Sequence, residues 1–395
     1  MSGVGIHVGL GEAGSGALPT FAAKLKELRV NAFRMDYGNR AYLGKDARVA
    51  SLDAFIKSQN ANGIKPILVL GAGPNIPQTD EAINDYVNFV RAVATRFKGS
   101  VHHYEAWNEP PNGNAWAFKL AAQIYPVLKS IDSANVLLGG VNAGINNGMT
   151  AAYVKGGGLK FADAMSLHVY PYQQYKPPNA ENAIGGLAAQ EKSAAAHMGG
   201  APVDLVVTEI GFPTHSGPNG YSLADAASNL ARVFLLASAP EMPYVKGVIW
   251  YDIADDGRDN KNIQHNFGVY GVGWTRKPAV DAMIAVNSLR ATSTVISSTT
   301  STSTNAAGQS YVVHTVKHED SAGGTYTYAV WTETPNVESK AYNISDASPI
   351  NVSGICADNA LCRTESVSGN GTGSVSITFR DSPIFIKTKA SDLTF

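Results

Sequence analysis

Two glutamates, a hundred residues apart, lie at the ends of apolar segments and could take part in one reaction. Glu109 closes the segment VHHYEAWNE and precedes two prolines, and Glu209 lies within DLVVTEIGF. Two carboxyl groups that meet over one bond can divide the chemistry, because one can donate a proton to the leaving group while the other attacks. The fold must therefore bring these two segments to a common place.

The first 290 residues contain eight short apolar runs that alternate with helical patterns. The runs cover residues 5–11, 31–37, 65–71, 101–109, 135–142, 162–172, 204–212 and 245–253, and the clearest helices are expected at 18–28, 81–97, 223–238 and 278–289. This alternation predicts parallel strands joined by helices. The count of eight favours a closed barrel, and no Gly-rich phosphate loop follows the first run. We therefore predict an α/β fold, with a catalytic (β/α)8 TIM barrel at residues 1–290.

The remaining residues predict a second, smaller domain. Residues 291–310 are rich in Ser and Thr and form either a flexible connector or a first strand. Short alternating segments separated by Gly, Asn, Asp and Pro follow, which is typical of an antiparallel β-sandwich at residues 311–395. The two cysteines, Cys356 and Cys362, lie in this part, where a local disulfide is one option.

The barrel prediction places Glu109 and Glu209 opposite one another. Strands four and seven are three steps apart around a ring of eight, and the loops after the strands form the active site in such barrels. Glycoside cleavage needs a carboxyl pair of this kind, separated by roughly 5 to 5.5 Å when configuration is retained. Trp107 and the prolines should partly desolvate Glu109 and disfavour its ionised form. Arg34, near the end of the second run, could keep Glu209 ionised.

The segment Trp107-Asn108-Glu109-Pro110 on strand four, with Glu209 on strand seven, resembles the pattern of glycoside hydrolase clan A. That clan consists of retaining β-glycosidases on a TIM barrel. The barrel followed by a β-sandwich looks most like glycoside hydrolase family 39. The resemblance implies double displacement, with Glu109 as acid/base and Glu209 as nucleophile. We expect no cofactor.

The same resemblance implies roles for five further residues. Asn108 would bond the 2-hydroxyl of the sugar, and Arg34 would support the nucleophile. His168 and Tyr170 match residues that line the site, with Tyr170 placed to bond Glu209, and Trp250 matches an aromatic floor beneath the sugar. Two alternatives stay open, since His168 fits a core histidine and Trp250 fits barrel packing.

The composition fits a soluble globular protein with a carbohydrate substrate. The formal net charge is −1, so no nucleic-acid partner is expected, and no apolar run reaches the ~18 residues needed for membrane insertion. We expect a monomer that is secreted or periplasmic, with its leader absent from this sequence, and the cytoplasm as the alternative.

Rival functions on the same fold lack the residues that they need. A metal-dependent hydrolase requires several His and Asp ligands at strand ends, whereas the first run offers only His7, so we expect no metal site. A Schiff-base aldolase requires a strand-end Lys, which HVYPY does not supply. A carbohydrate-binding protein without turnover is disfavoured by the intact carboxyl pair. The short loops favour endo cleavage of a polysaccharide or exopolysaccharide, with an exo-acting β-xylosidase or β-glucosidase type as the alternative.

Overall fold

The computed structural model describes most of the chain, in two compact units. The described residues are 1–6, 17–38, 47–73, 75–110, 114–143, 148–174, 178–304, 308–333, 339–344, 350–354, 365–367, 373–378, 381–389, 391, 393 and 395. The first unit contains residues 1–211 and 244–256, and the second contains residues 212–243 and 257–395. The sequence predicts one boundary near residue 290. The two units are instead defined by contacts between residues, so the second unit also includes residues 212–243, from before that boundary.

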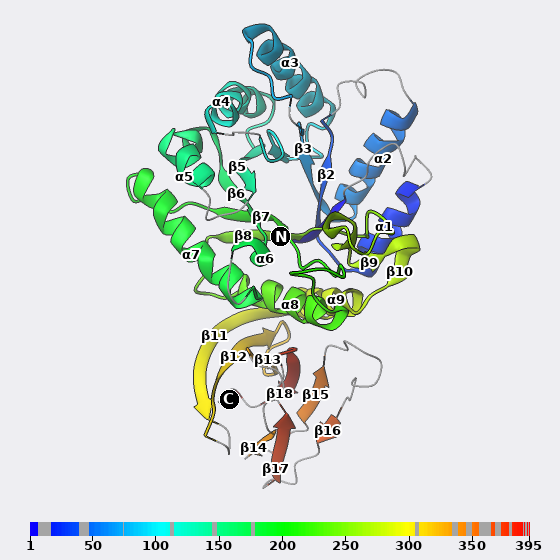
Figure 1. Cartoon of the computed structure of the whole chain (residues 1–395), viewed down its shortest axis with the longest axis vertical. Helices are drawn as coiled ribbons and strands as arrows, with labels where there is room; N and C mark the ends of the chain where they lie inside the picture. The colour runs from blue at the N-terminus through cyan, green and yellow to red at the C-terminus, as the bar shows by residue number, and fades with distance from the viewer. Residues whose placement is uncertain are drawn as a thin grey trace. The chain divides into compact units, whose positions relative to one another are not determined.

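The first unit is built on a closed barrel of eight parallel strands, which confirms the predicted architecture (Figure 1). The strands are β1 (Ser2–Ile6), β2 (Ala32–Asp36), β3 (Lys65–Val69), β4 (His103–Glu105), β5 (Val136–Ala143), β6 (Ala164–Val169), β7 (Leu205–Ile210) and β8 (Val245–Trp250). Each strand pairs with the next, and β1 pairs with β8, so the barrel has no free edge.

Apolar side chains and helical crossovers explain why this barrel forms. One buried cluster joins residues of six strands: Ala32, Ile67, Leu138, Ala164, Val206 and Ile249. The strands of this unit are separated by α1 (Leu18–Glu27), α2 (Ala47–Ala61), α3 (Asp80–Arg96), α4 (Asn114–Ile131), α5 (Gly148–Lys155), α6 (Pro171–Gln174) and α7 (Ala180–His197). Thr79 caps α3 by accepting a hydrogen bond from the Ala82 amide at 3.2 Å, which satisfies one free amide of the first turn.

The second unit combines two helices with antiparallel sheets. Helix α9 (Pro278–Thr292) runs directly into β11 (Ser293–Thr304), and Arg290 donates a hydrogen bond to the Phe234 carbonyl of α8 (Leu223–Leu236). Within the Ser/Thr-rich stretch at 291–310, residues 291–292 thus end α9, residues 293–304 form β11, and Ser310 begins the next strand. β11 is the first strand of a six-stranded sheet, in which it pairs with β12 (Ser310–Asp320) and is followed in order by β13 (Tyr326–Thr332), β18 (Ile384–Thr388), β15 (Ile350–Gly354) and β16 (Glu365–Val367).

A separate pair of strands completes the sandwich-like domain at the C-terminus. This pair is β14 (Ser339–Ile344) with β17 (Gly373–Thr378). The buried core of the domain includes Tyr311, Tyr328 and Ile386. The predicted fold class, a TIM barrel followed by a small antiparallel β domain, is thus confirmed. Cys356 and Cys362 lie outside the described residues, so their pairing stays a prediction.

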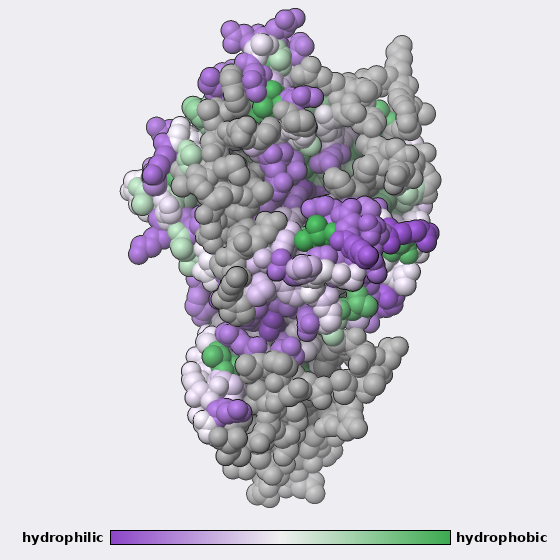
Figure 2. Space-filling view, viewed as in Figure 1, coloured by the Kyte–Doolittle hydropathy of each residue, from purple (hydrophilic) through white to green (hydrophobic). Residues whose placement is uncertain are grey.

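On the face drawn in Figure 2, the described residues are mostly hydrophilic or intermediate in hydropathy, with small hydrophobic patches. Among the described residues, the exposed large hydrophobic side chains are Leu223 and Ile296. No helix in the described part of the chain has both the length and the apolar character needed to cross a membrane.

Candidate active site

A bulge in β7 aims Glu209 at the polar residues of its neighbours. Along β6 and β7, Leu167 pairs with Val207, but the next pair is His168 with Glu209. Thr208 is therefore the extra residue in β7. Since a bulge changes which side chains lie opposite one another, it places Glu209 level with His168.

Glu109 lies on the loop after β4, not at the end of the strand. β4 ends at Glu105, four residues earlier than the sequence analysis placed the strand end. The backbone of Glu109 has a positive φ of 43°, which is uncommon for a non-glycine residue and lies outside the extended region that a strand requires. Two hydrogen bonds hold this loop: the Asn108 amide donates to the Gly71 carbonyl at 2.6 Å, and Trp107 Nε1 donates to the Gly73 carbonyl at 3.0 Å.

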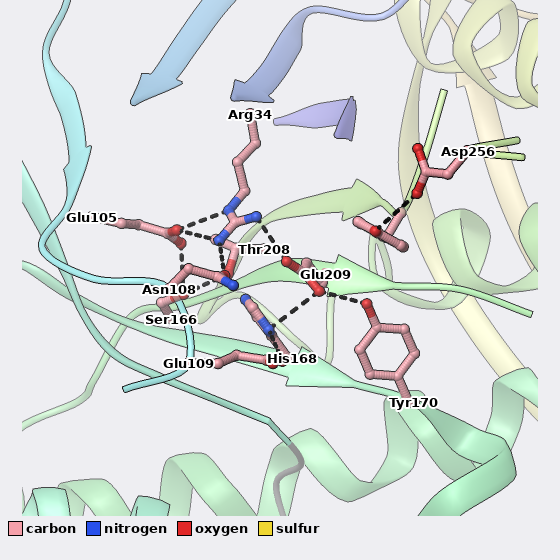
Figure 3. Close-up of polar contacts among 11 residues, drawn as sticks. Arg34, Glu105, Asn108, Glu109, Ser166, His168, Tyr170, Thr208, Glu209 and Asp256 are labelled. Atoms are coloured by element: carbon pink, nitrogen blue, oxygen red, sulfur yellow. Dashed lines mark hydrogen bonds and ion pairs between the residues drawn. The ribbon is translucent and has the colours of Figure 1, made fainter. Parts of the chain in front are cut away.

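Arg34 links three of the site's polar side chains (Figure 3). Its Nη1 donates to Glu209 Oε1 at 2.8 Å, its Nη2 donates to Asn108 Oδ1 at 2.7 Å, and its Nε donates to Glu105 Oε2 at 2.8 Å. Burial alone would lower the pKa of Arg34, but the charges of Glu105 and Glu209 raise it, so the guanidinium stays positive. The contact with Glu209 is the one that the sequence suggested.

Glu105 is a member of this network that the sequence analysis did not identify. Its side chain is 0% exposed, and its Oε1 accepts a hydrogen bond from Ser166 Oγ at 2.8 Å. Ser166 in turn contacts Thr208 Oγ1 at 2.5 Å. A carboxylate inside an apolar strand needs a charged partner, because an isolated buried charge is costly. Glu105 within the fourth apolar run and Arg34 within the second could therefore have been predicted to form a pair.

His168 contacts both carboxyl groups, and Tyr170 contacts that of Glu209. His168, with 0% of its side chain exposed, places Nδ1 2.7 Å from Glu109 Oε1 and 3.3 Å from Glu209 Oε2. Tyr170 donates its hydroxyl hydrogen to Glu209 Oε2 at 2.5 Å. Burial, followed by the charge of Glu209, raises the pKa of Tyr170 well above its ordinary value, so the hydroxyl keeps its proton.

These contacts bring the two predicted catalytic carboxyls together. One oxygen of Glu109, one of Glu209 and a nitrogen of His168 all lie within 4.8 Å of one another. The set of one imidazole and two carboxylates could also accept a divalent ion. In the structure, these atoms contact one another, while Arg34 places a positive charge against Glu209. This arrangement suits the chemistry of a carboxyl pair more than that of a cation site.

The electrostatics of Glu109 differ from the sequence-based expectation. We expected desolvation to disfavour the ionised form of Glu109. Burial does raise its pKa, but the hydrogen bond and charge of His168, together with the charge of Arg34, outweigh burial and give a net lowering. The expectation was wrong because His168 on β6 and Arg34 on β2 lower this pKa. Both residues are brought close to Glu109 by the closure of the barrel, which the sequence around Glu109 does not show.

Replacing His168 by Phe should extend activity to higher pH. The variant loses the hydrogen bond and charge that lower the pKa of Glu109, while burial, which raises it, remains. A general acid works in its protonated form, so a raised pKa moves the basic limb of the kcat/KM profile to higher pH. The measurement is kcat/KM against pH on an unactivated substrate. His197→Phe, at the exposed end of α7, should leave that limb in place; an unmoved or lowered limb in His168→Phe would contradict the assignment.

Trp250 gives no open face to a ligand in this structure. The residue is 1% exposed at the end of β8, where it pairs with Val4 and Ile210. Its expected role as a floor beneath the sugar stays a prediction. The next residue, Tyr251, is only partly buried and lies with its ring centroid 6.4 Å from that of Tyr170.

The barrel, with Glu109 on the loop after β4 and Glu209 near the end of β7, defines a glycosyl hydrolase of the clan A type, as the sequence motif suggested. Residues 6–235 match the family model Cellulase (glycosyl hydrolase family 5), and the chain belongs to this family. No curated protein sequence matches the chain.

Solved structures share the fold at low sequence identity. A family 39 glycoside hydrolase from Bacteroides cellulosilyticus WH2 is 20% identical, with a TM-score of 0.72 over 98% of this chain and 80% of that one. A monomeric beta-xylosidase from Caulobacter crescentus CB15 is 13% identical, with a TM-score of 0.63 over 99% and 96%. A GH30 endoxylanase from Clostridium papyrosolvens C71 is 12% identical, with a TM-score of 0.62 over 98% and 96%. These similarities agree with the clan A resemblance and with a fold like that of family 39.

Proposed function

We propose that the protein is a retaining β-glycosidase that acts by double displacement. The observation that carries this proposal is the spacing of the carboxyls, since an oxygen of Glu109 and an oxygen of Glu209 lie within 4.8 Å of one another. Retaining enzymes hold their carboxyls ≈ 5–5.5 Å apart, whereas inverting enzymes need about 6.5–9.5 Å to admit a water.

In the first step, Glu209 attacks the anomeric carbon while Glu109 protonates the departing glycosidic oxygen. The bond to the leaving group breaks as the Glu209 ester forms, and the aglycone leaves as an alcohol. Arg34 and Tyr170 hold Glu209 by hydrogen bonds to its two oxygens, and Asn108 is positioned by Arg34 for the 2-hydroxyl. In the second step, Glu109 removes a proton from water, which attacks the anomeric carbon and releases Glu209.

A hollow that reaches the loop carrying Glu109 supports endo cleavage of a polysaccharide. It has a volume of about 850 Å³ and is lined by the exposed polar residues Asn75 and Gln78 and by the buried aromatic residues Trp107, Tyr86 and Phe89. Trp107 precedes Glu109 by two residues, so the hollow adjoins the acid/base loop. A volume of this size suits sugar units beyond the one being cleaved. Exo action on a terminal sugar is the alternative.

Removing the polar lining of this hollow should weaken binding of long substrates only. In the Asn75→Ala, Gln78→Ala double variant, losing two hydrogen-bonding groups at about 1 kcal/mol each predicts a KM increase of roughly 10- to 30-fold on polysaccharide. If the hollow binds only sugar units beyond the one being cleaved, the KM for an aryl monosaccharide glycoside should not change. Equal KM increases on both substrates, or no increase on polysaccharide, would remove this support for endo cleavage.

Hydrolysis of aryl β-glycosides and a polysaccharide panel tests the proposal as a whole. Proton NMR during turnover should show the β-anomer as the first product, and early products from polysaccharide should be oligosaccharides. An α-anomer as first product would overturn retention, and early monosaccharides would favour the exo alternative. Binding without release of reducing ends would indicate a carbohydrate-binding protein instead.

A further inference from the structure

Glu105 lies too deep to touch a substrate, yet it is bonded to the residues around the nucleophile. Its side chain is 0% exposed on β4, and both of its oxygens have partners. Oε2 accepts from Arg34 Nε at 2.8 Å and lies 2.7 Å from Nη2, while Oε1 accepts from Ser166 at 2.8 Å. Its effect on the reaction must therefore pass through a neighbour.

The geometry of Arg34 shows what Glu105 can control. The guanidinium is planar, so fixing the edge that carries Nε and Nη2 also fixes the direction of Nη1. With that edge against Glu105, Nη1 meets Glu209 and Nη2 meets Asn108 (Figure 3). A flexible side chain on β2 is thereby held in one orientation by a buried anion on β4.

We propose that Glu105 is a positioning residue that acts through Arg34, orienting the guanidinium so that it holds Glu209 and Asn108 together. This inference rests on the proposed function, because it assigns Glu209 the role of nucleophile. Ser166 supports Glu105 from the other side, and its contact with Thr208 ties the arrangement to the bulge that carries Glu209.

A double-mutant cycle on kcat/KM tests the proposal. Glu105→Gln keeps the shape but loses the charge-assisted hydrogen bonds, so we expect about a 10-fold fall in kcat with KM unchanged. Arg34→Lys removes the planar guanidinium that bonds Glu105, Glu209 and Asn108 at once, so it should lower kcat further. If Glu105 acts through Arg34, adding Glu105→Gln to Arg34→Lys should cause no additional loss. An activated aryl glycoside keeps the slow variants measurable, and active-site titration expresses each rate per folded enzyme.

Two further variants keep the test decisive. Ser166→Ala removes one hydrogen bond to Glu105, so it should lower kcat about fivefold in the native background and not in Arg34→Lys. If Glu105→Gln does not fold, Ser166→Ala takes its place in the double-mutant cycle. Asp163→Asn is the matched control, because it breaks a carboxylate contact with Lys129 at the other end of β6 and should lower Tm without changing kcat.

The outcomes separate this inference from the proposed function. If the native protein hydrolyses no glycoside, the proposed function fails. If it hydrolyses glycosides but Glu105→Gln has native kcat per active site, the positioning role is overturned. Losses that multiply in the double variant would also overturn it, because Glu105 would then act independently of Arg34.

Discussion

Glu209→Ala should reduce turnover of every glycoside by on the order of 10⁵-fold or more, as expected when the group that forms the covalent intermediate is removed. The methyl group of alanine cannot attack the anomeric carbon. Arg34 Nη1 and the Tyr170 hydroxyl, which bond the two oxygens of Glu209, then have no carboxylate to hold. The loss should not depend on the leaving group, because formation of the intermediate fails with all of them. Steady-state rates on an aryl series and on polysaccharide measure this effect.

Rescue of activity by azide gives a second test of this prediction. The space left by the carboxylate admits a small anion on the nucleophile's side of the sugar, so added azide should restore activity and give an α-glycosyl azide. Glu241→Ala, at an exposed position before β8, should behave like the native enzyme. Glu209→Gln checks that lost activity does not come from the smaller side chain. A β-azide product would assign the nucleophile to another residue.

Glu109→Ala should give a loss that depends strongly on the leaving group. Protonation by a general acid is worth about 10²–10⁴-fold, and this factor is needed only when the departing oxygen is basic. Glycosides of poor leaving groups should therefore lose this factor in kcat/KM. Dinitrophenyl glycosides should form the intermediate at a nearly native rate and then accumulate it, because the base that activates water is also missing.

A pre-steady-state burst with a dinitrophenyl glycoside measures this accumulation directly. Azide should accelerate the second step and give a β-glycosyl azide, since it attacks from the face that Glu109 occupied. The basic limb of the pH profile should also disappear, because the titrating acid is gone. Equal losses with all leaving groups, without a burst, would contradict the acid/base role.

These two results would differ because the protein treats two identical side chains differently. Glu209 is buried and receives hydrogen bonds from Arg34 and Tyr170, whereas 36% of the Glu109 side chain is exposed and its partner is His168. Two carboxyls in different environments can take separate roles in one reaction, even though His168 lies near both. Exposure also leaves Glu109 accessible to the water that it must activate.

The strands of the barrel could be predicted closely from hydrophobic patterning. The run at residues 204–212 contains β7 at Leu205–Ile210, and the run at 31–37 contains β2 at Ala32–Asp36. A strand buried on both faces needs a continuous apolar segment, so the local sequence carries this information. The fourth run was predicted too long, because the apolar residues Ala106 and Trp107 are buried in the loop after β4 and are not part of the sheet.

The sequence alone determined the eightfold alternation, and with it which strands carry Glu109 and Glu209 to the same end of a barrel. It also indicated Arg34 and Tyr170 as neighbours of Glu209, through motif positions on strands two and six. Tertiary structure decided the rest. The buried network through Glu105, the direction of the pKa shift of Glu109 and the burial of Trp250 all depend on distances between side chains from different strands. Such distances follow from strand register and bulges, as at Thr208, which hydrophobic periodicity does not encode.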